Sequence, residues 1–391
     1  MEGQATIHVG LNAHLLSGQA GYRKGGIHNY IQQLIDHLPT ADPALRVTIF
    51  TGRIQEELRE LHPGLCWETS RWPTERPFVR IAWEQLVQPW ALRRAGVALL
   101  HALAFVSPVG ALTPAVVTVH DLSFLRFPER FRPANRLYLS VMTRFSCRRA
   151  RRIIAVSQAT ADEIVRLLGV PLERIDVVPH GVEHERFHPL PTGQVEAFRR
   201  EKGLPKRFVL FVGTLEPRKN LKALIEAFVR TEAMREGVRL LVVGGKGWYY
   251  QEILKLVEDL DLTDAVCFAG FVPAAELPLW YNAATIFVYP SLYEGFGMPL
   301  LEAMACGTPV IGSDASCLPE VVGDAGLLVP PDDVEGLAAR MKRLLADADL
   351  RADLSQRGRV RASAFTWEGT ARATVTSYRR ALSIDDDRQA K

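Results

Sequence analysis

The sequence predicts an α/β protein built from two doubly wound domains. Short apolar runs, which are typical of buried parallel strands, alternate with amphipathic helical patterns almost throughout the chain. These runs fall into two series, and the segment between them is rich in proline and polar residues, as a linker is. With 391 residues, 48% of them hydrophobic and 23% charged, the chain is long enough for two globular domains.

Each series is large enough for one Rossmann-like domain. The first series has six candidate strands: ATIHVGL, RVTIF, VALLHAL, AVVTVHDL, RIIAVS and RIDVVPH. The second has five: RFVLFVG, VRLLVVGG, AVCFAGF, TIFVYPS and TPVIGS. We place the boundary near Phe187, which gives domains of residues 1–186 and 187–366. The last segment predicts an amphipathic helix over Trp367–Leu382, and the final residues, DDDRQAK at 385–391, are expected to form a frayed polar tail.

Composition argues against several classes of protein. No apolar run approaches the roughly 20 residues of a membrane-spanning helix, and the first residues lack the pattern of a signal peptide, so we expect a cytoplasmic protein. The five cysteines lack CxxC spacing and are expected to be buried apolar side chains rather than zinc ligands or disulfides. The net charge of +3 is too small to indicate nucleic acid, although residues up to Leu190 carry 22 Lys and Arg against 17 Asp and Glu.

The most informative stretch runs from Tyr289 to Val310. An apolar strand leads into a loop with Glu294 and two glycines, and a helix is predicted to begin at Met298, with proline at an early helical position. This loop is expected at the carboxyl edge of a buried parallel sheet, where ligands bind. Glycines and a helix N-terminus suit an anion such as phosphate, and Glu294 and Glu302 could hold hydroxyl groups beside it. A simpler interpretation is also open, in which Glu294 caps the helix and Glu302 faces solvent.

A second loop supplies positive charge. The strand RFVLFVG ends at Gly213, and the loop after it holds Thr214, Glu216, Arg218 and Lys219. Cations at the mouth of a strand–loop–helix unit are placed to neutralise a diphosphate, and arginine can do so with two hydrogen bonds. The three glycines of LLVVGGKGW are interpreted as a further sheet-edge loop, which lines a nucleotide pocket.

Two further signals lie in the first half of the chain. Gly25 and Gly26 precede an amphipathic helix, which fits a plain turn as well as a phosphate-binding loop. His120 and Asp121 follow an apolar strand, at the edge where ligands bind. A histidine at that place could equally be a hydrogen-bonded core residue.

The segment EGFGMPLLE, in which seven residues separate Glu294 from Glu302, is followed by A-x-A-x-G-x-P-V-I. This combination resembles the signature of retaining glycosyltransferases of family 4, which have the GT-B architecture. The resemblance implies two Rossmann-like domains that face each other across a cleft. Residues 1–186, joined by the terminal crossover helix 367–391, would lie on the acceptor side, and residues 187–366 would bind the nucleotide-sugar donor.

The resemblance also implies roles for single residues. Three would be catalytic: Glu294, His120 and Lys219. A larger set would bind the donor: Gly25, Gly26, Thr214, Arg218, Lys219, Val272, Glu294, Phe296, Gly297, Met298 and Glu302. In the family the lysine contacts the diphosphate, the first glutamate contacts sugar hydroxyls and the second contacts the ribose. Some members carry a cation directly after the strand-end glycine, where this chain has Thr214, so Arg218 or another residue must supply that charge.

These roles predict a retaining glycosyltransferase without metal ion or cofactor, because no paired-carboxylate motif accompanies the phosphate-binding loops. Trp83, Glu84 and Gln85 resemble a pattern of bacterial mannosyltransferases in the family. We interpret that short resemblance as a hint about the acceptor only. The predicted reaction moves a hexose, taken as mannose from GDP-mannose, to a glycan or lipid-linked glycan. The alternatives are a UDP-sugar-dependent member of the family, a non-catalytic sugar-nucleotide-binding relative and, less favoured, an epimerase or a phosphorylase.

A helix over residues 134–152 combines apolar side chains with clustered arginines. This combination fits a helix in peripheral contact with the inner membrane surface, which a lipid-linked acceptor would explain. It also fits a core helix whose basic end is solvated and favoured by the helix dipole. We prefer the second interpretation, because the apolar residues suit packing on a sheet.

Overall fold

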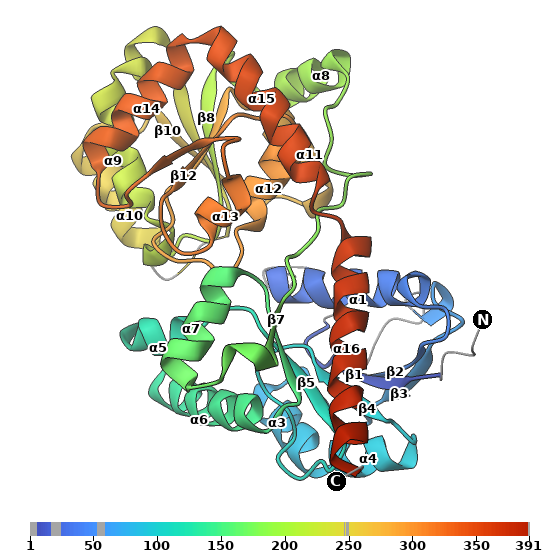
Figure 1. Ribbon diagram of the computed structural model, residues 1–391. Coiled ribbons are helices and arrows are strands. Elements are labelled where there is room, and N and C mark those ends of the chain that lie inside the picture. Colours follow the sequence, from blue (N-terminus) through green and yellow to red (C-terminus); the bar gives the residue numbers. More distant parts are fainter. Residues whose placement is uncertain (1–5, 17–24, 53–58, 246, 248–249, 390–391) are drawn as a thin grey trace. The chain divides into compact units, whose positions relative to one another are not determined.

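The chain forms two compact units, each with one parallel sheet covered by helices (Figure 1). The computed structural model describes residues 6–16, 25–52, 59–245, 247 and 250–389. The N-terminal unit comprises Met1–Gly181 and Trp367–Lys391, and the C-terminal unit comprises Val182–Thr366. The chain passes from one unit to the other between Gly181 and Val182 and returns between Thr366 and Trp367. No helix in the described ranges is both long and apolar enough to cross a membrane.

The N-terminal sheet has the strand order β3-β2-β1-β4-β5-β6-β7, and all its pairings are parallel. Its strands in the described ranges are β1 His8–Asn12, β2 Arg46–Thr51, β3 Cys66–Thr69, β4 Leu99–Ala102, β5 Ala115–Val119, β6 Arg152–Ala155 and β7 Ile175–Val177. Six of these strands coincide with apolar runs. The sequence missed β3, because this edge strand, CWET, is short and has no buried residue.

The C-terminal sheet has the order β10-β9-β8-β11-β12-β13 and is also parallel. Its strands are β8 Phe208–Val212, β9 Arg239–Val243, β10 Val266–Gly270, β11 Ile286–Tyr289, β12 Val310–Ser313 and β13 Leu327–Val329. The short edge strand β13 was missed. In both sheets the order reverses next to the first strand, between β1 and β4 and between β8 and β11. This reversal is the topological switch point at which Rossmann-like sheets bind ligands.

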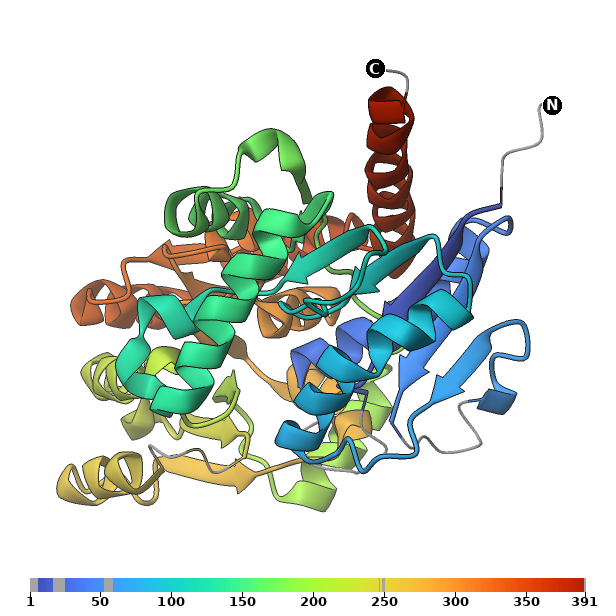
Figure 2. The same cartoon turned by 90° about the horizontal axis from the view of Figure 1, so that it is seen from below.

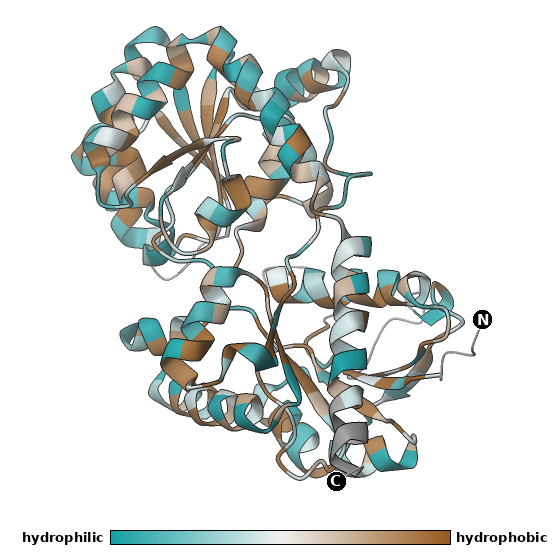
Figure 3. Ribbon diagram, in the orientation of Figure 1, coloured by the Kyte–Doolittle hydropathy of each residue, from teal (hydrophilic) through white to brown (hydrophobic). Residues whose placement is uncertain are grey.

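Helices cover both sheets. Hydrophobic and hydrophilic residues alternate along these helices, whereas the strands are mostly hydrophobic (Figure 3). The N-terminal unit has α1 Gly26–Ala41, α3 Pro77–Leu86, α4 Gln88–Arg94, α5 Ser123–Arg126, α6 Pro133–Arg149, α7 Gln158–Leu168 and α16 Trp367–Gln389. The C-terminal unit has α8 Thr192–Lys202, α9 Leu221–Thr231, α10 Tyr250–Asp259, α11 Leu277–Ala283, α12 Met298–Ala305, α13 Leu318–Val322, α14 Val334–Ala346 and α15 Ala348–Ser363.

The terminal helix α16 packs against α1 in the N-terminal unit. The Tyr378 hydroxyl lies 2.7 Å from Nδ1 of the buried His101, and Arg379 forms an ion pair of 2.8 Å with Asp42. The helix continues to Gln389, so the expected frayed tail is wrong for residues 385–389, while residues 390–391 lie outside the described ranges. Extending an existing helix needs no new nucleus, and Arg388 and Gln389 are good helix formers, so α16 continues through the three aspartates.

All five cysteines are free, but only three of them are buried. Cys66 and Cys267 are exposed, so the expectation of buried side chains is wrong for these two. Cys66 lies on the missed edge strand β3, and Cys267 lies on β10, the edge strand of the second sheet. Edge strands leave one side of the chain open to solvent, which the apolar character of the segment AVCFAGF did not reveal.

Candidate functional site

Two loops meet at the carboxyl edge of the C-terminal sheet, where the strand order reverses. One follows β8 and carries Arg218 and Lys219, and the other follows β11 and carries Glu294. The backbone N–H of Leu292 donates to the carbonyl of Arg218 at 2.7 Å, and the Ser291 hydroxyl oxygen lies 2.9 Å from the same carbonyl oxygen. These bonds fix the loops to each other and bring the predicted cations to the predicted carboxylate.

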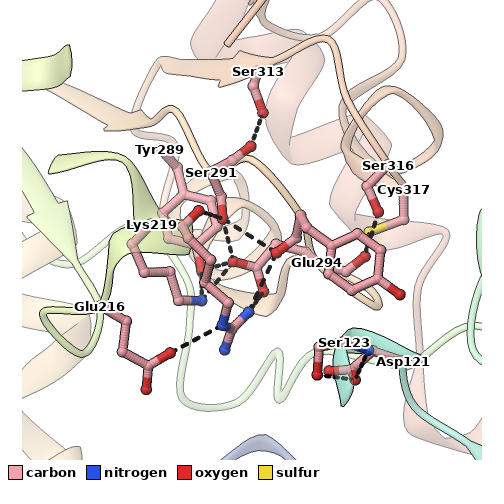
Figure 4. Close-up of polar contacts among 12 residues, drawn as sticks. Asp121, Ser123, Glu216, Lys219, Tyr289, Ser291, Glu294, Ser313, Ser316 and Cys317 are labelled. Carbon is pink, nitrogen blue, oxygen red and sulfur yellow. Dashed lines mark hydrogen bonds and ion pairs between the residues drawn. The ribbon is translucent and has the colours of Figure 1, made fainter. Parts of the chain in front are cut away.

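Glu294 is the centre of a buried polar cluster (Figure 4). Its Oε1 accepts hydrogen bonds from Lys219 Nζ at 2.5 Å, from the Tyr289 hydroxyl at 2.9 Å and from the Ser291 hydroxyl at 2.6 Å. Its Oε2 accepts from Arg218 Nη1 at 2.9 Å. No side chain caps α12, so the interpretation of Glu294 as a helix cap is wrong. The carboxylate instead holds the two cations of the neighbouring loop.

The electrostatics of this cluster keep Glu294 ionised. Burial acts to raise the pKa of its carboxyl, but the charges of Lys219 and Arg218 outweigh burial and lower the pKa to about 2. Burial lowers the pKa of Lys219, against the opposing effect of Glu294. Arg218 also pairs with Glu216, with Nε and Oε2 3.0 Å apart. The site thus balances two cations with two carboxylates.

Helix α12 begins directly after this loop and presents its N-terminus at the same edge. Its N-cap, Gly297, has a φ of +95°, and a Cβ there would lie 2.5 Å from Leu318 Cδ2, so this position requires glycine. The helix begins at Met298, as predicted, and has no acidic residue in its first turn. Phe296 is buried, with its ring 5.9 Å from that of Phe365. An uncapped N-terminus of this kind suits an anionic group.

Glu302 lies one turn into α12 and does not simply face solvent. The side chain is partly buried, and the Tyr281 hydroxyl donates to its Oε2 at 2.9 Å. Burial raises the pKa of Glu302 to about 7, although the bond from Tyr281 acts to lower it. The Glu302 carboxyl therefore keeps its proton to a higher pH than that of Glu294.

The remaining donor-side candidates lie at the same sheet edge. Thr214 is exposed two residues beyond the end of β8, and Val272 is partly exposed two residues beyond the end of β10. The glycines after β9 have a packing reason, because a Cβ at Gly244 would lie 1.9 Å from the Gly213 carbonyl oxygen and one at Gly247 would lie 2.1 Å from that of Leu215. They allow the β9 loop to approach the β8 loop. Lys246 and Trp248 of this segment lie outside the described residues.

In the N-terminal unit, His120 is buried at the carboxyl end of β5. Its Nε2 donates to the Leu103 carbonyl at 2.8 Å, and its ring lies 4.9 Å from that of Tyr30. Burial lowers the pKa of His120 to about 4, so the ring is neutral at pH 7 and Nδ1 is its hydrogen-bond acceptor. Asp121 accepts bonds from the Ser123 N–H and hydroxyl at 3.0 and 2.7 Å, which orders the start of α5. The two residues therefore have separate tasks.

Gly25 and Gly26 form the start of α1, with Gly25 as the N-cap. Gly25 has no side chain with which to cap this helix, and the first turn of the helix has no acidic residue. A Cβ at Gly26 would meet no atom within 4 Å, so packing inside the protein does not require glycine there. The predicted role of both glycines in binding a diphosphate stays a prediction.

A second polar cluster, which the sequence indicated only through Trp83, Glu84 and Gln85, lies after β1. Asn12 Nδ2 donates to Glu84 Oε1 at 3.4 Å, and the ring of His14 lies 4.2 Å from that of Trp83. Asn12, His14 and Glu84 are all buried, and burial raises the pKa of Glu84. Within the described ranges, both ring nitrogens of His14 and Oδ1 of Asn12 have no hydrogen-bond partner. Buried polar groups without partners are rare in proteins and point to a missing ligand.

Two parallel-sheet domains with a cationic, carboxylate-bearing edge define a glycosyltransferase of the GT-B class. Comparison with known families agrees: residues 24–186 match "Glycosyltransferase Family 4", and residues 194–361 match "Glycosyl transferases group 1". The chain belongs to this family of glycosyltransferases, as the E-x7-E segment predicted.

Curated relatives and solved structures support this assignment over most of the chain. The O-antigen chain mannosyltransferase B of Escherichia coli is 35% identical over 294 residues, which are 75% of this chain and 77% of that protein. A D-inositol 3-phosphate glycosyltransferase of Frankia alni is 32% identical over 401 residues, covering 92% and 95% of the two chains. The structure of sucrose-phosphate synthase from Thermosynechococcus elongatus has a TM-score of 0.77 and 25% identity, covering 97% of this chain and all of that one.

Proposed function

We propose that this glycosyltransferase transfers mannose from GDP-mannose to a glycan or lipid-linked glycan, with retention of the anomeric configuration and without a metal ion. The observation that carries the proposal is the cluster of Lys219, Arg218 and Glu294 beside the uncapped N-terminus of α12. The similarity to an O-antigen mannosyltransferase favours mannose as the sugar.

The cluster is suited to stabilise a leaving nucleoside diphosphate. Lys219 and Arg218 supply two cations, and α12 supplies the partial positive charge of a helix N-terminus. These groups would perform the neutralisation for which other transferases use a divalent cation. Arg218 is paired with Glu216, and donor binding would exchange this carboxylate for a phosphate.

Glu294 would act mainly by holding the two cations in place. Its Oε1 already accepts three hydrogen bonds, and its low pKa keeps it from acting as a general acid. The backbone around Phe296 and Gly297 would face the sugar hydroxyls, and Glu302 would accept a bond from the ribose. Val272 would lie beside the base, and Nδ1 of His120 would accept a bond from a sugar hydroxyl.

Retention then follows from attack by the acceptor on the face that the diphosphate leaves. The bond between the anomeric carbon and the phosphate oxygen breaks while the bond to the acceptor oxygen forms. The acceptor's proton passes to the leaving phosphate oxygen, and the electron pair of the broken bond stays on the diphosphate. No enzyme carboxylate is needed as a nucleophile, which suits a Glu294 that is engaged by two cations.

The cluster of Asn12, His14 and Glu84 is a candidate for the acceptor site. A saccharide carries hydroxyl groups that both donate and accept, so it would satisfy the carboxyl of Glu84 and the nitrogens of His14. The position after β1, at the switch point of the N-terminal sheet, is where this fold binds ligands.

The proposal is tested with purified protein, thermal-shift measurements and product analysis. GDP-mannose should raise the unfolding midpoint and UDP- and ADP-sugars should not, with EDTA making no difference. Incubation of GDP-mannose with a mannosylated acceptor should then give an α-linked product. A shift with a UDP-sugar would support a glycosyltransferase but contradict GDP-mannose as its donor. Loss of activity with EDTA would contradict the proposal that no metal ion is needed. No shift with any nucleotide sugar would indicate a non-catalytic relative.

A further inference from the structure

The loop after β4 holds Phe105 in a backbone conformation that is rare for a bulky residue. Its φ is +59°, and the backbone N–H of Val106 donates to the carbonyl of Ala104 at 2.6 Å, which closes a three-residue γ-turn around Phe105. A γ-turn with a positive central φ is strained, and a large side chain at such an angle is an outlier. Glycine would adopt the turn without this cost, so the ring of Phe105 is expected to have a task that outweighs the strain.

The same loop holds the imidazole of His120. The Leu103 carbonyl accepts from His120 Nε2 at 2.8 Å, and the Phe105 ring lies 5.7 Å from the imidazole in a T-shaped arrangement, with an interplanar angle of 72°. The backbone N–H of Phe105 donates to the carbonyl of Thr118 on β5 at 2.9 Å. Since β4 and β5 are neighbours in the sheet, which Figure 2 shows from below, the turn is anchored to the strand that His120 directly follows.

The ring of Phe105 is itself held by the apolar core. It lies 5.9 Å from the ring of the buried Phe124, and the two planes are nearly perpendicular, at 88°. Phe124 belongs to a core cluster to which β5, β6, α5 and α7 contribute, and Phe105 packs against this cluster. Rotation of the Phe105 ring away from His120 would break the contact with Phe124, so the turn and the core favour the same orientation of the ring.

Helix α6 covers this core cluster only in part. Its Leu139 packs on the cluster, but Leu137 and Val141 are 65% and 55% exposed. The preferred interpretation of residues 134–152, in which the apolar side chains pack on a sheet, is therefore wrong for Leu137 and Val141. The loop residue Phe131 packs on the cluster as well, which makes it a suitable comparison for the other loop phenylalanine.

Two further rings lie against the imidazole of His120. The ring of Tyr30 is 4.9 Å away at an interplanar angle of 80°, and the ring of His180 is 5.7 Å away at 25°. Burial lowers the pKa of His120 to about 4, although the adjacent Asp121 acts to raise it. His101 and His180 are titratable neighbours whose charge would repel a protonated His120, and burial lowers the pKa of both. These surroundings favour a neutral imidazole in a fixed orientation.

We infer that Phe105 is a positioning residue for His120. The strained turn holds the Phe105 ring against the imidazole, which keeps Nδ1 in one orientation and shields the imidazole from water. The inference rests on the proposed function, in which Nδ1 of His120 accepts a bond from a sugar hydroxyl. Phe105 acts through His120 and needs no contact with the donor or the acceptor.

The first test compares Phe105→Gly with Phe105→Ala in the full chain. Both variants lack the ring, and they differ only in a Cβ at a positive φ. The glycine variant should unfold at a midpoint about 2–8 °C above that of the alanine variant, because glycine relieves the strain. Both variants should lose kcat/KM for transfer from the nucleotide sugar on the order of 10-fold to 100-fold, and the more stable glycine variant should not recover it. Equal midpoints, or activity that follows the midpoint, would contradict the inference.

The second test follows His120 by nitrogen NMR of protein labelled in its histidines, with His120→Gln to assign the signals. In the parent, His120 should stay neutral down to about pH 4, with its proton on Nε2. In Phe105→Gly and Phe105→Ala water reaches the imidazole, so the pKa of His120 should rise toward 6.5 and the transfer rate should fall as the pH drops below that value. Phe105→Leu, which keeps apolar bulk at the turn, should give an intermediate titration.

The matched control is Phe131→Ala, which removes a ring from the same core cluster, 6.5 Å from the ring of Phe124. In the described part of the chain Phe131 makes no ring contact with His120, so the His120 signals and the transfer rate should equal those of the parent. An unchanged titration in both Phe105→Gly and Phe105→Ala would rule out the inference. Because the NMR measurement needs no substrate, a shifted titration with undiminished transfer would confirm that Phe105 holds His120 and would remove His120 from the proposed reaction.

Discussion

Replacing Glu294 with glutamine removes the carboxylate that holds Lys219 and Arg218 at the carboxyl edge of the C-terminal sheet, called the donor edge below. The pKa of this buried group is lowered from 4.5 to about 2. Each pKa unit corresponds to about 1.4 kcal/mol, so the shift represents about 3 kcal/mol of stability for the ionised, folded form. Glutamine keeps the shape and can still accept from Lys219, but it leaves Lys219 and Arg218 without their opposite charge.

At pH 7 the variant should therefore unfold at a midpoint about 6–12 °C lower, using about 2–4 °C per kcal/mol for a domain of this size. The sign of the pH dependence is fixed by the lowered pKa. The stabilisation from Glu294 is fully present above pH 4.5 and is lost as the pH falls toward 2, so parent and variant should converge in acid. Affinity for the nucleotide sugar should also fall, because the cations are no longer held in position.

Differential scanning fluorimetry and calorimetric titration of GDP-mannose measure both effects. A cycle with Lys219→Met adds a direct measure of coupling, which should be 0.5–3 kcal/mol in magnitude, as is usual for residues in contact. The matched control for the stability loss is Glu302→Gln, the other glutamate of the segment, which forms no ion pair in the described ranges. A Glu294→Gln protein with an unchanged midpoint and undiminished donor affinity would refute the reasoning.

Three further predictions follow from the site. Burial raises the pKa of Glu302 to about 7, so between pH 4.5 and 7 the folded protein keeps a proton that the unfolded chain has lost. The free energy of unfolding should therefore decline as the pH rises through this range. Glu302→Gln should flatten that decline in a thermal-shift series. Glu216→Gln should free Arg218 and tighten GDP-mannose binding by up to about fivefold in titration calorimetry, whereas weaker binding would contradict the exchange of Glu216 for phosphate. His14→Phe should stabilise the protein by about 1 kcal/mol, because it removes two buried nitrogens that have no hydrogen-bond partner in the described ranges. The variant should also have a higher KM for the acceptor and an unchanged affinity for the donor. Lower stability with an unchanged KM would exclude His14 from the acceptor site.

The fold was largely predictable because buried parallel strands are nearly continuous apolar runs. Runs such as FVLFV at β8 and IFVY at β11 have no competing explanation in a chain of this length. The edge strands β3 and β13 could not be found in this way, since an edge strand is short and needs few buried side chains. The strand order, by contrast, could not be predicted from any single segment, because it depends on which strands pair in the sheet.

The sequence predicted which residues lie at the donor edge, but not how their side chains interact. Loops after apolar strands, with Lys219 in one and Glu294 in the other, were visible in the sequence. Their ion pair joins residues 75 positions apart and exists because β8 and β11 are neighbours in the sheet. Tyr289 and Ser291 complete the cluster by donating hydrogen bonds to Glu294. They were missed because they lie at the end of an apolar strand and just after it.

The two switch-point clusters differ in a way that has consequences for binding. At the C-terminal sheet the charges of Glu294, Lys219 and Arg218 are paired before any ligand arrives, so the donor edge is preorganised and its residues exchange partners when a diphosphate binds. At the N-terminal sheet, His14 and Asn12 leave buried atoms unsatisfied, so that edge gains its missing hydrogen bonds only from a ligand. Mutations at the first edge should therefore cost stability and function together, while mutations at the second should separate them, with stability rising as acceptor binding falls.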